Sequence, residues 1–305
     1  MFHIYGVDYI NFLHLYQGAT VVSLPSFDPA VFLSSIQKHN IEKVCIVPPI
    51  LIFMVNHPIV DKFDLSAMRN ATVGAAPADE ALIKQFINKF PGTVLVQGYG
   101  SSEGLITHLQ PVDMTRHKPG SAGYGASHCD LKIHCIETGA ALGPGEKGEV
   151  RLRGPQVMKG YYDNEEATAN TINEEGWLCT GDLGYFDEEG NIFVVDRLKE
   201  LIKYKAFQVA PAELEATLLT HAQIIDACVI GVPDADAGEV PRAYVVCAPD
   251  STLNEEDVNA FMGEYLSPHK QLRGGIAFVD ALPKSASGKL LRRVLLQEYL
   301  DATSS

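Results

Sequence analysis

The order of strand and helix signals in the first part of the chain constrains its fold more than any other feature. Three runs rich in β-branched residues are expected to form strands, at residues 19–24, 42–47 and 93–97. One expected helix begins at Asp28-Pro29, and a second follows Pro77 and ends before Pro91-Gly92. Alternating strands and helices predict a parallel sheet, so residues that follow the strands should meet at one edge.

The texture of the sequence changes twice after this α/β part. Short strands punctuated by glycine and proline, from 118 to 196, predict an antiparallel, barrel-like subdomain. From 197 to 305, a helix that opens at Pro211, two strands and a helix capped at Asn254 predict a small α+β domain. The expected organisation is a large domain over 1–196 and a small C-terminal domain over 197–305.

The charge and cysteine content exclude several classes of function. The 305 residues include 38 acidic and 24 basic ones, for a formal net charge of −14, which argues against a nucleic-acid partner. Apolar runs are strand-sized, so no transmembrane segment is expected. The six cysteines lack CxxC spacing, and His128-Cys129 and His134-Cys135 lack further nearby ligands, so no zinc site is expected.

One glycine-rich segment, residues 97–104 (QGYGSSEG), directly follows an expected strand. Its glycines allow close approach of a ligand, its hydroxyls can bind phosphate oxygens and Glu103 can bind Mg²⁺. A turn without a ligand is the simpler alternative. The segment also matches GxSxG, the nucleophile elbow of α/β-hydrolases, with Ser102 as the nucleophile. That elbow requires a helix after it, which the following β-branched residues and Pro111 disfavour.

Three further stretches carry charge in positions suited to a nucleotide site. Residues 177–182 (WLCTGD) place Asp182 after a tight turn, where its carboxylate could accept both hydroxyls of a ribose. Residues 196–205 (DRLKELIKYK) concentrate charge at the domain boundary, and residues 283–289 (PKSASGK) place Lys289 on a loop of small residues. Taken singly, each is a solvated surface segment, and the sequence contains no Walker phosphate loop.

Taken together, these stretches belong to a set of motifs that run in the order found in adenylate-forming enzymes. The motifs are MFHIYG, VGAAPA, QGYGSSEG, GEVRLRGPQVMKGYYDNEEAT, GWLCTGD, VDRLKELIKYKAFQVAPAELE and LPKSASGKLLRR. The chain most resembles 4-coumarate:CoA ligases and their luciferase-like and acyl-CoA synthetase relatives, over essentially all of its length. The resemblance implies a carboxylic acid:CoA ligase of the α/β class that uses ATP, Mg²⁺ and CoA, with a small-molecule acid as substrate.

The resemblance also implies roles for single residues. The expected contacts to adenine, phosphate and ribose are Gly74, Ala75, Ala76, Pro77, Gln97, Gly98, Tyr99, Ser102, Asp182 and Arg197. His3 and Tyr5 would line the acyl pocket, and Glu103 would bind Mg²⁺. Lys289 and Gln208 would serve adenylation, and Lys203 would serve the thioester step after a rotation of residues 197–305 about Lys199.

Several positions depart from the family's pattern. Ser102 replaces the usual threonine but keeps its hydroxyl. Ala206 replaces a glycine that borders the pantetheine path, and Ser26 stands where plant relatives have a lysine near the CoA phosphates. The motif at Met1 begins inside the corresponding family motif, so the Ser/Thr/Gly-rich loop that grips the β- and γ-phosphates is expected to be missing and the large domain incomplete.

Three functions stay open on the sequence alone. The first is the acid:CoA ligase, 4-coumarate- or fatty-acid-specific, and the second is a catalytically silent protein that keeps an acyl or AMP pocket. The third is a luciferase-like oxygenase, which shares every motif. A cytoplasmic location is expected; relatives can be peroxisomal, but this sequence ends in DATSS rather than an SKL-type signal.

Overall fold

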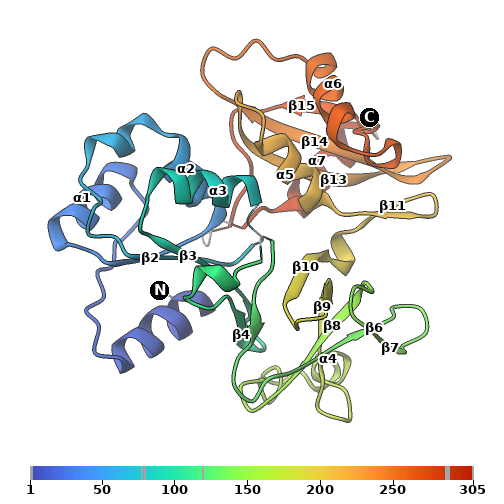
Figure 1. Cartoon of the computed structure of the whole chain (residues 1–305). Coiled ribbons are helices and arrows are strands. Elements are labelled where there is room, and N and C mark those ends of the chain that lie inside the picture. Colours follow the sequence, from blue (N-terminus) through green and yellow to red (C-terminus); the bar gives the residue numbers. More distant parts are fainter. Residues whose placement is uncertain (1–2, 77, 79, 119, 286–288, 304–305) are drawn as a thin grey trace. The chain divides into compact units, whose positions relative to one another are not determined.

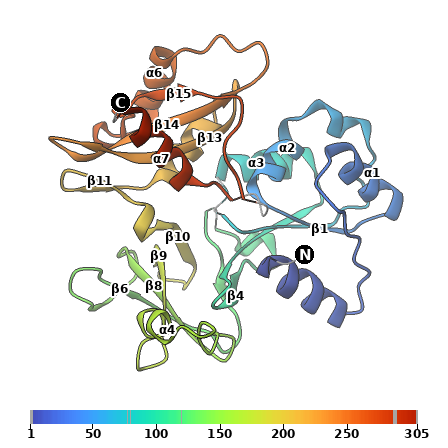
Figure 2. The ribbon, with the colours of Figure 1, turned by 180° about the vertical axis from the view of Figure 1, so that it is seen from behind.

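The computed structural model describes residues 3–76, 78, 80–118, 120–285 and 289–303. The chain divides into two compact units, Met1–Val194 and Val195–Ser305, and we describe each by itself. Figures 1 and 2 show the elements from opposite sides. Both units mix helices and sheets, which confirms the expected α/β class. No helix among the described residues is both long and apolar enough to cross a membrane.

The first unit begins with a sheet that is parallel on one side. Its strand order is β1 (Lys43–Ile46), β2 (Asn70–Val73), β3 (Val94–Ser101), β4 (Leu105–Leu109) and β5 (Tyr124–Gly125). The pairs β1–β2 and β2–β3 are parallel, as the sequence predicted, whereas β4 pairs antiparallel with β3 and β5. The ends of β2 and β3 therefore lie side by side at one edge.

Helices cover both faces of this sheet. In both views α2 (Pro48–Asn56) and α3 (Glu80–Lys89) lie on one face, and the π-helix η1 (Tyr5–His14) lies on the other. Helix α1 (Pro29–His39) begins where predicted, because the Asp28 carboxylate accepts a hydrogen bond from the Val31 amide at 2.8 Å. The core between helices and strands includes the fully buried Leu33, Leu51 and Phe86.

Two local expectations for this unit need correction. Residues 19–24 form no strand; they run exposed between η1 and α1. A β-branched run becomes a strand only where a neighbouring strand supplies backbone partners, and the described residues supply none there. The strand expected to end at 97 continues instead through Ser101, so the glycine-rich segment is largely strand rather than turn.

A second, antiparallel sheet belongs to the first unit, apart from the last three residues of its strand β10, which fall in the second unit. Its order is β10 (Ile192–Arg197), β9 (Leu178–Phe186), β8 (Gly148–Arg153), β6 (Asp130–His134) and β7 (Ala141–Leu142). It encloses a small core around Ile133, Leu152 and Ile192. As described, the sheet is open, with β10 and β7 as its edges, and does not close into a barrel. Helix α4 (Glu165–Thr171) and the short helices η2 (Pro58–Lys62) and η3 (Met114–Arg116) complete this unit.

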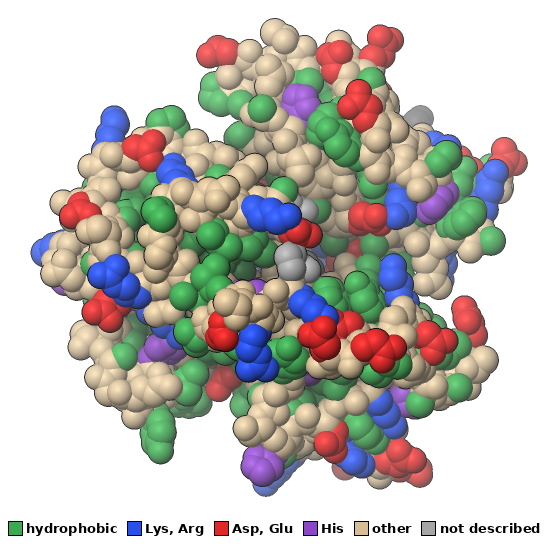
Figure 3. Space-filling model, viewed as in Figure 1, with side chains coloured by type: hydrophobic (Ala, Val, Ile, Leu, Met, Phe, Trp, Pro, Cys, Tyr) green, Lys and Arg blue, Asp and Glu red, His purple; other side chains and the backbone are tan. Residues whose placement is uncertain are grey.

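The second unit contains a sheet in the order β12 (Phe207–Val209), β11 (Ile202–Tyr204), β14 (Gly238–Cys247), β13 (Ile224–Asp234), and β15 (Ile276–Phe278) pairs with β14. Its helices are η4 (Leu198–Glu200), α5 (Pro211–Leu219), α6 (Glu255–Tyr265), η5 (Pro268–Lys270) and α7 (Arg292–Thr303). Asn254 caps α6 as the sequence indicated, and Asp257 completes a reciprocal capping box with it. Charged side chains of both signs are interspersed with hydrophobic ones on the face in Figure 3.

Candidate active site

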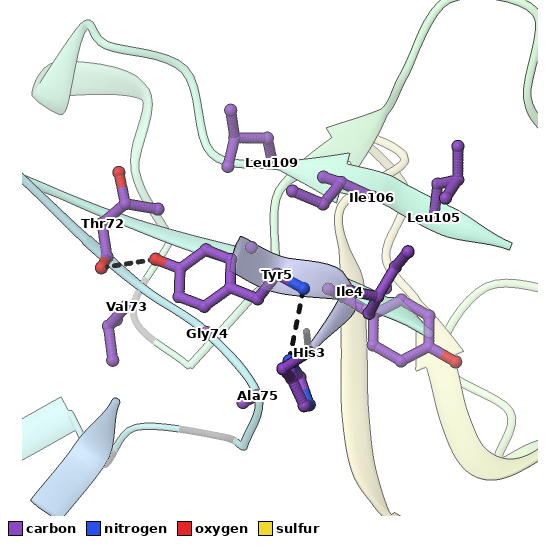
Figure 4. Close-up of a pocket in the computed structure, with 13 residues that line it drawn as sticks. His3, Ile4, Tyr5, Thr72, Val73, Gly74, Ala75, Leu105, Ile106 and Leu109 are labelled. Carbon is purple, nitrogen blue, oxygen red and sulfur yellow. Dashed lines mark hydrogen bonds between the residues drawn. The ribbon is translucent and has the colours of Figure 1, made fainter. Parts of the chain in front are cut away.

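A small cavity lies in the first unit where η1 meets the ends of β2 and β3 (Figure 4). Six predicted residues line it: His3, Tyr5, Gly74, Ala75, Gly98 and Tyr99. Three apolar side chains of β4 line it as well, namely Leu105, Ile106 and Leu109. Its volume of about 40 Å³ has room for a few water molecules.

Tyr5 lines this cavity and is held by two hydrogen bonds. Its hydroxyl donates a hydrogen bond to the Thr72 carbonyl oxygen at 2.9 Å, and its backbone amide donates to His3 Nδ1 at 3.2 Å (Figure 4). Burial raises the pKa of the Tyr5 hydroxyl well above its usual value, so the hydroxyl stays a donor at neutral pH. The phenol presents an apolar ring with one polar tip to any ligand.

Three glycines, Gly74, Gly98 and Gly100, contribute to the remaining wall. At Gly100 a Cβ atom would lie 2.2 Å from the Leu105 carbonyl oxygen, so β3 and β4 approach this closely only with glycine there. Ala75 has φ of 70°, a left-handed conformation that costs energy for a residue with a side chain. A strained, exposed residue beside a cavity is typical of a ligand-binding segment.

Gln97, also predicted as a site residue, is not among the residues that line this cavity. It is buried, its amide oxygen accepts from the Ala78 amide at 3.2 Å, and its amide nitrogen donates to the Ser121 carbonyl at 3.2 Å. The side chain thus joins the segment after Gly74 to the strand, and it supports the wall from behind. Ala76 is exposed but does not line the cavity, and Pro77 lies outside the described residues.

Tyr99 connects the cavity to Asp182. Its ring lines the cavity, while its hydroxyl donates to Asp182 Oδ2 on β9 at 2.6 Å. This bond joins the two sheets of the first unit. Tyr99 therefore both lines the predicted acyl pocket and contacts Asp182, the predicted ribose-binding carboxylate.

Glu103 is held by a residue to which the sequence analysis gave no role. The Tyr161 hydroxyl donates to Glu103 Oε1 at 2.9 Å, and the Met158 amide donates to the Glu103 carbonyl oxygen at 2.8 Å. Ser102, next to it, is exposed. The motif around Tyr161 was recognised, but nothing in its spacing indicated that it would fold back onto Glu103. The described residues contain no group of three or more side chains suited to hold a metal.

The remaining predicted residues belong to the second unit. Lys203 on β11 and Gln208 on β12 are exposed and directly opposite each other in the hairpin. Arg197 and Lys199 are also exposed at the start of the unit. Lys289 is exposed on the segment before α7, where its amide donates to Ser285 Oγ at 3.2 Å. Ion pairs of Lys284 with Asp226 and of Arg292 with Glu200 and Glu215 lie on either side of this segment, and the sequence did not indicate them.

Comparison with known proteins identifies the family. A model described as AMP-binding enzyme matches residues 1–162, and one described as AMP-binding enzyme C-terminal domain matches residues 213–289. The chain belongs to the AMP-binding enzyme family. The two matches follow one another in the order of the two units, and together they include most of the predicted site residues.

Named relatives of this AMP-binding enzyme are CoA ligases. It is 47% identical to a probable 4-coumarate–CoA ligase 1 from Dictyostelium discoideum over 295 residues, 96% of this chain and 53% of the relative. It is 45% identical to the peroxisomal OPC-8:0-CoA ligase 1 of Arabidopsis thaliana, over 97% of this chain and 55% of that protein. The chain thus spans about half the length of these relatives.

A solved structure with a similar fold contains a reaction intermediate. The o-succinylbenzoate CoA synthetase of Bacillus subtilis, in complex with the acyl-adenylate intermediate OSB-AMP, matches with a TM-score of 0.83 and 32% identity. The match covers 96% of this chain and 58% of that one. The superposed folds support the adenylate-forming class recognised in the sequence.

Proposed function

We propose that this protein takes part in an ATP-dependent carboxylic acid:CoA ligase reaction. In the first half-reaction a carboxylate oxygen bonds to the α-phosphorus of ATP, and pyrophosphate leaves with the electron pair of the broken P–O bond. In the second, the CoA sulfur bonds to the acyl carbon and the thiol proton is released, while the C–O bond to AMP breaks and AMP leaves with its electron pair. The reaction couples acid, ATP and CoA to acyl-CoA, AMP and pyrophosphate.

The bond between Tyr99 and Asp182 is the observation that carries this proposal. An acyl-adenylate joins an acyl group to the 5′-phosphate of a nucleoside, so its site needs an apolar wall directly beside a ribose-binding carboxylate. Tyr99 supplies part of the wall, and its 2.6 Å hydrogen bond holds Asp182 in place. A carboxylate fixed in this way accepts vicinal ribose hydroxyls with little loss of side-chain entropy.

Glu103 and Ser102 are the groups that we propose for the phosphates. Mg²⁺ binds proteins through one or two carboxylates and takes further ligands from substrate phosphates, so a single oriented carboxylate fits it. The Tyr161 hydroxyl orients the Glu103 carboxylate from behind. When bound, Mg²⁺ would neutralise phosphate charge. The Ser102 hydroxyl would donate to a phosphate oxygen.

Cationic and polar side chains of the second unit complete the proposal. Attack of a carboxylate on a phosphate brings two anions together, so the charge of Lys289 would stabilise the transition state of adenylation. Gln208 would assist adenylation, and Arg197 would help to hold the ribose. Lys203 would serve the thioester step. We propose residues 197–305 as the mobile domain that presents these groups in turn, pivoting near Lys199.

The lining of the cavity favours an acid with an uncharged tail. Leu105, Ile106 and Leu109 present hydrocarbon, the aromatic rings of Tyr5 and Tyr99 flank them, and the described lining contains neither lysine nor arginine. A second carboxylate on the acid would have no cation beside it there. We therefore propose aryl or fatty monocarboxylic acids as substrates, in keeping with the relatives' names.

The test uses each half-reaction separately. A purified protein that contains this chain and has the full length of its relatives receives ATP, Mg²⁺ and one acid at a time (4-coumarate, cinnamate, octanoate or succinate), with hydroxylamine to trap the acyl-adenylate as a hydroxamate. A second assay supplies preformed 4-coumaroyl-adenylate and CoA and measures the thioester by mass spectrometry. We expect product from at least one monocarboxylic acid and none from succinate. Absence of hydroxamate and thioester with every acid would refute the proposal.

The two alternative functions have distinct outcomes in the same assays. A silent binding protein would bind AMP or acyl-adenylate without turnover, and the relatives' names give this reading no support. A luciferase-like oxygenase would consume the adenylate only with oxygen. We propose a cytoplasmic location, tested by a fluorescent fusion; punctate peroxisomal fluorescence would contradict it.

A further inference from the structure

Arg292, the first residue of α7, makes charge-assisted contacts with three separate elements of the second unit. Its guanidinium donates to Glu215 Oε1 at 2.8 Å and Oε2 at 2.7 Å on α5, and to Glu200 Oε2 on η4 at 2.8 Å. Its Nε donates to the Val229 carbonyl oxygen on β13 at 3.3 Å. One side chain thus ties the start of α7 to α5, η4 and β13.

The surroundings of this contact make its geometry specific. Glu215 is 8% exposed, and its Oε1 also accepts the Val229 amide at 2.8 Å. A buried carboxylate without a partner is costly, so Glu215 and Arg292 hold one another in place. A planar guanidinium can bond two carboxylates and a carbonyl at once, whereas a lysine ammonium cannot reproduce this fork.

The segment that carries Lys289 ends at this arginine. Its incoming side is held by an ion pair between Lys284 and Asp226 of β13, and Lys284 and Leu290 form an antiparallel bridge. The Leu291 amide donates to the Pro283 carbonyl oxygen at 2.9 Å. The base of the loop is therefore fixed on both sides, and Lys289 lies three residues before the Arg292 anchor.

We propose that Arg292 is a positioning residue for Lys289. It fixes the outgoing side of the Lys289 loop to Glu215, and through Glu200 it joins this loop to the segment that follows Lys199. A backbone rotation near Lys199 then moves Lys289 together with the rest of the second unit. The catalytic part of this inference rests on the proposed function of Lys289, whereas the mechanical part concerns the loop alone.

The mechanical part is tested by hydrogen–deuterium exchange on the 305-residue chain. Lys289, Leu291 and Ser285 carry hydrogen-bonded amides at the loop base. Arg292→Lys should speed exchange of these amides by about tenfold, because the charge remains but the fork is lost. Exchange in α6 should stay unchanged. The control is Arg293→Lys, which changes the next, exposed arginine and should leave the loop as it is.

A second variant keeps the proposal testable if Arg292→Lys fails to fold. Glu200→Gln removes the negative charge from the contact with η4, although its amide oxygen can still accept, and it leaves the Glu215 pair intact, so it should speed loop exchange by a smaller factor. Equal acceleration across the whole second unit in both variants would mean that Arg292 merely stabilises the fold. Unchanged loop exchange would also overturn the proposal.

The kinetic arm separates this inference from the proposed function. If the parent protein forms acyl-adenylate, Arg292→Lys should lower kcat of that step by roughly 10- to 100-fold with KM values within about twofold, because Lys289 acts at the transition state. Thioester formation from supplied adenylate should be unaffected. Equal slowing of both steps contradicts positioning. A parent that forms neither adenylate nor thioester refutes the proposed function, and the exchange data alone then decide whether Arg292 holds the loop.

Discussion

The Tyr99 hydroxyl donates to Asp182 Oδ2 at 2.6 Å, although 83 residues separate the two side chains in the chain. The bond joins β3 of the parallel sheet to β9 of the antiparallel sheet. It holds the carboxylate while the other side of the same tyrosine lines the candidate acyl cavity. The adjoining halves of an acyl-adenylate would therefore meet at this residue.

Removal of the Tyr99 hydroxyl should weaken nucleotide binding. In Tyr99→Phe the ring remains but Asp182 loses its donor, so we expect the Kd for AMP, measured by calorimetry, to rise about tenfold. Tyr162→Phe is the matched control, because that ring is 94% exposed. Equal Kd values for AMP in the parent and in Tyr99→Phe would show that the hydrogen bond from Tyr99 to Asp182 does not contribute to nucleotide binding.

Substitution at Glu103 and Tyr161 should change metal dependence in a graded way. Glu103→Gln removes the proposed ligand, and we expect the Mg²⁺ concentration for half-maximal adenylate formation to rise at least about tenfold. Tyr161→Phe leaves the ligand but loses its 2.9 Å donor, so the rise should be smaller. A direct titration with Mn²⁺, followed by electron paramagnetic resonance, gives a readout independent of turnover. A larger effect at Tyr161 than at Glu103 would contradict the assignment.

The two exposed lysines of the second unit should act in different half-reactions. In a protein that contains this chain and has the full length of its relatives, Lys289→Ala should slow adenylate formation and spare thioester formation from supplied adenylate, since the charge stabilises the first transition state. Lys203→Ala should do the reverse. Rapid-quench measurements of each step decide between these outcomes. If both substitutions slow the same step and spare the other, the proposed division between the lysines fails.

His108 should make the first unit sensitive to acid. It is 1% exposed on β4, and burial lowers its pKa from 6.5 to about 4. Between pH 6.5 and pH 4 the unfolded chain therefore binds a proton at His108, whereas the folded chain does not. The contribution of neutral His108 to the free energy of unfolding is thus complete above pH 6.5 and falls as the pH drops towards 4. We expect a loss of about 2 kcal/mol between pH 7 and pH 5 from this group.

The measurement for His108 compares urea unfolding at both pH values in the parent and in His108→Gln, which does not titrate. The substitution lowers stability at neutral pH, so the informative quantity is the difference in pH dependence. The parent should lose about 2 kcal/mol more than the variant. Parallel losses would show that other groups govern the acid response.

Local chemistry in the sequence indicated where several elements begin. Asp28 and Asn254 cap the helices that they were expected to cap, and the β-branched run at 42–47 contains β1. Capping bonds and side-chain alternation join residues within a few positions of one another, so they can be recognised without a fold. The ordered motifs identified the family for the same reason.

Tertiary structure decided the strand pairings and side-chain contacts that join residues far apart in the sequence. Residues 19–24 have the composition of a strand but no described partner, and Gln97 supports the cavity wall from behind instead of forming it. Tyr161 meets Glu103 from 58 residues away, and Arg292 meets Glu215 from 77 residues away. Packing of whole elements brings such pairs together, and no local spacing encodes it.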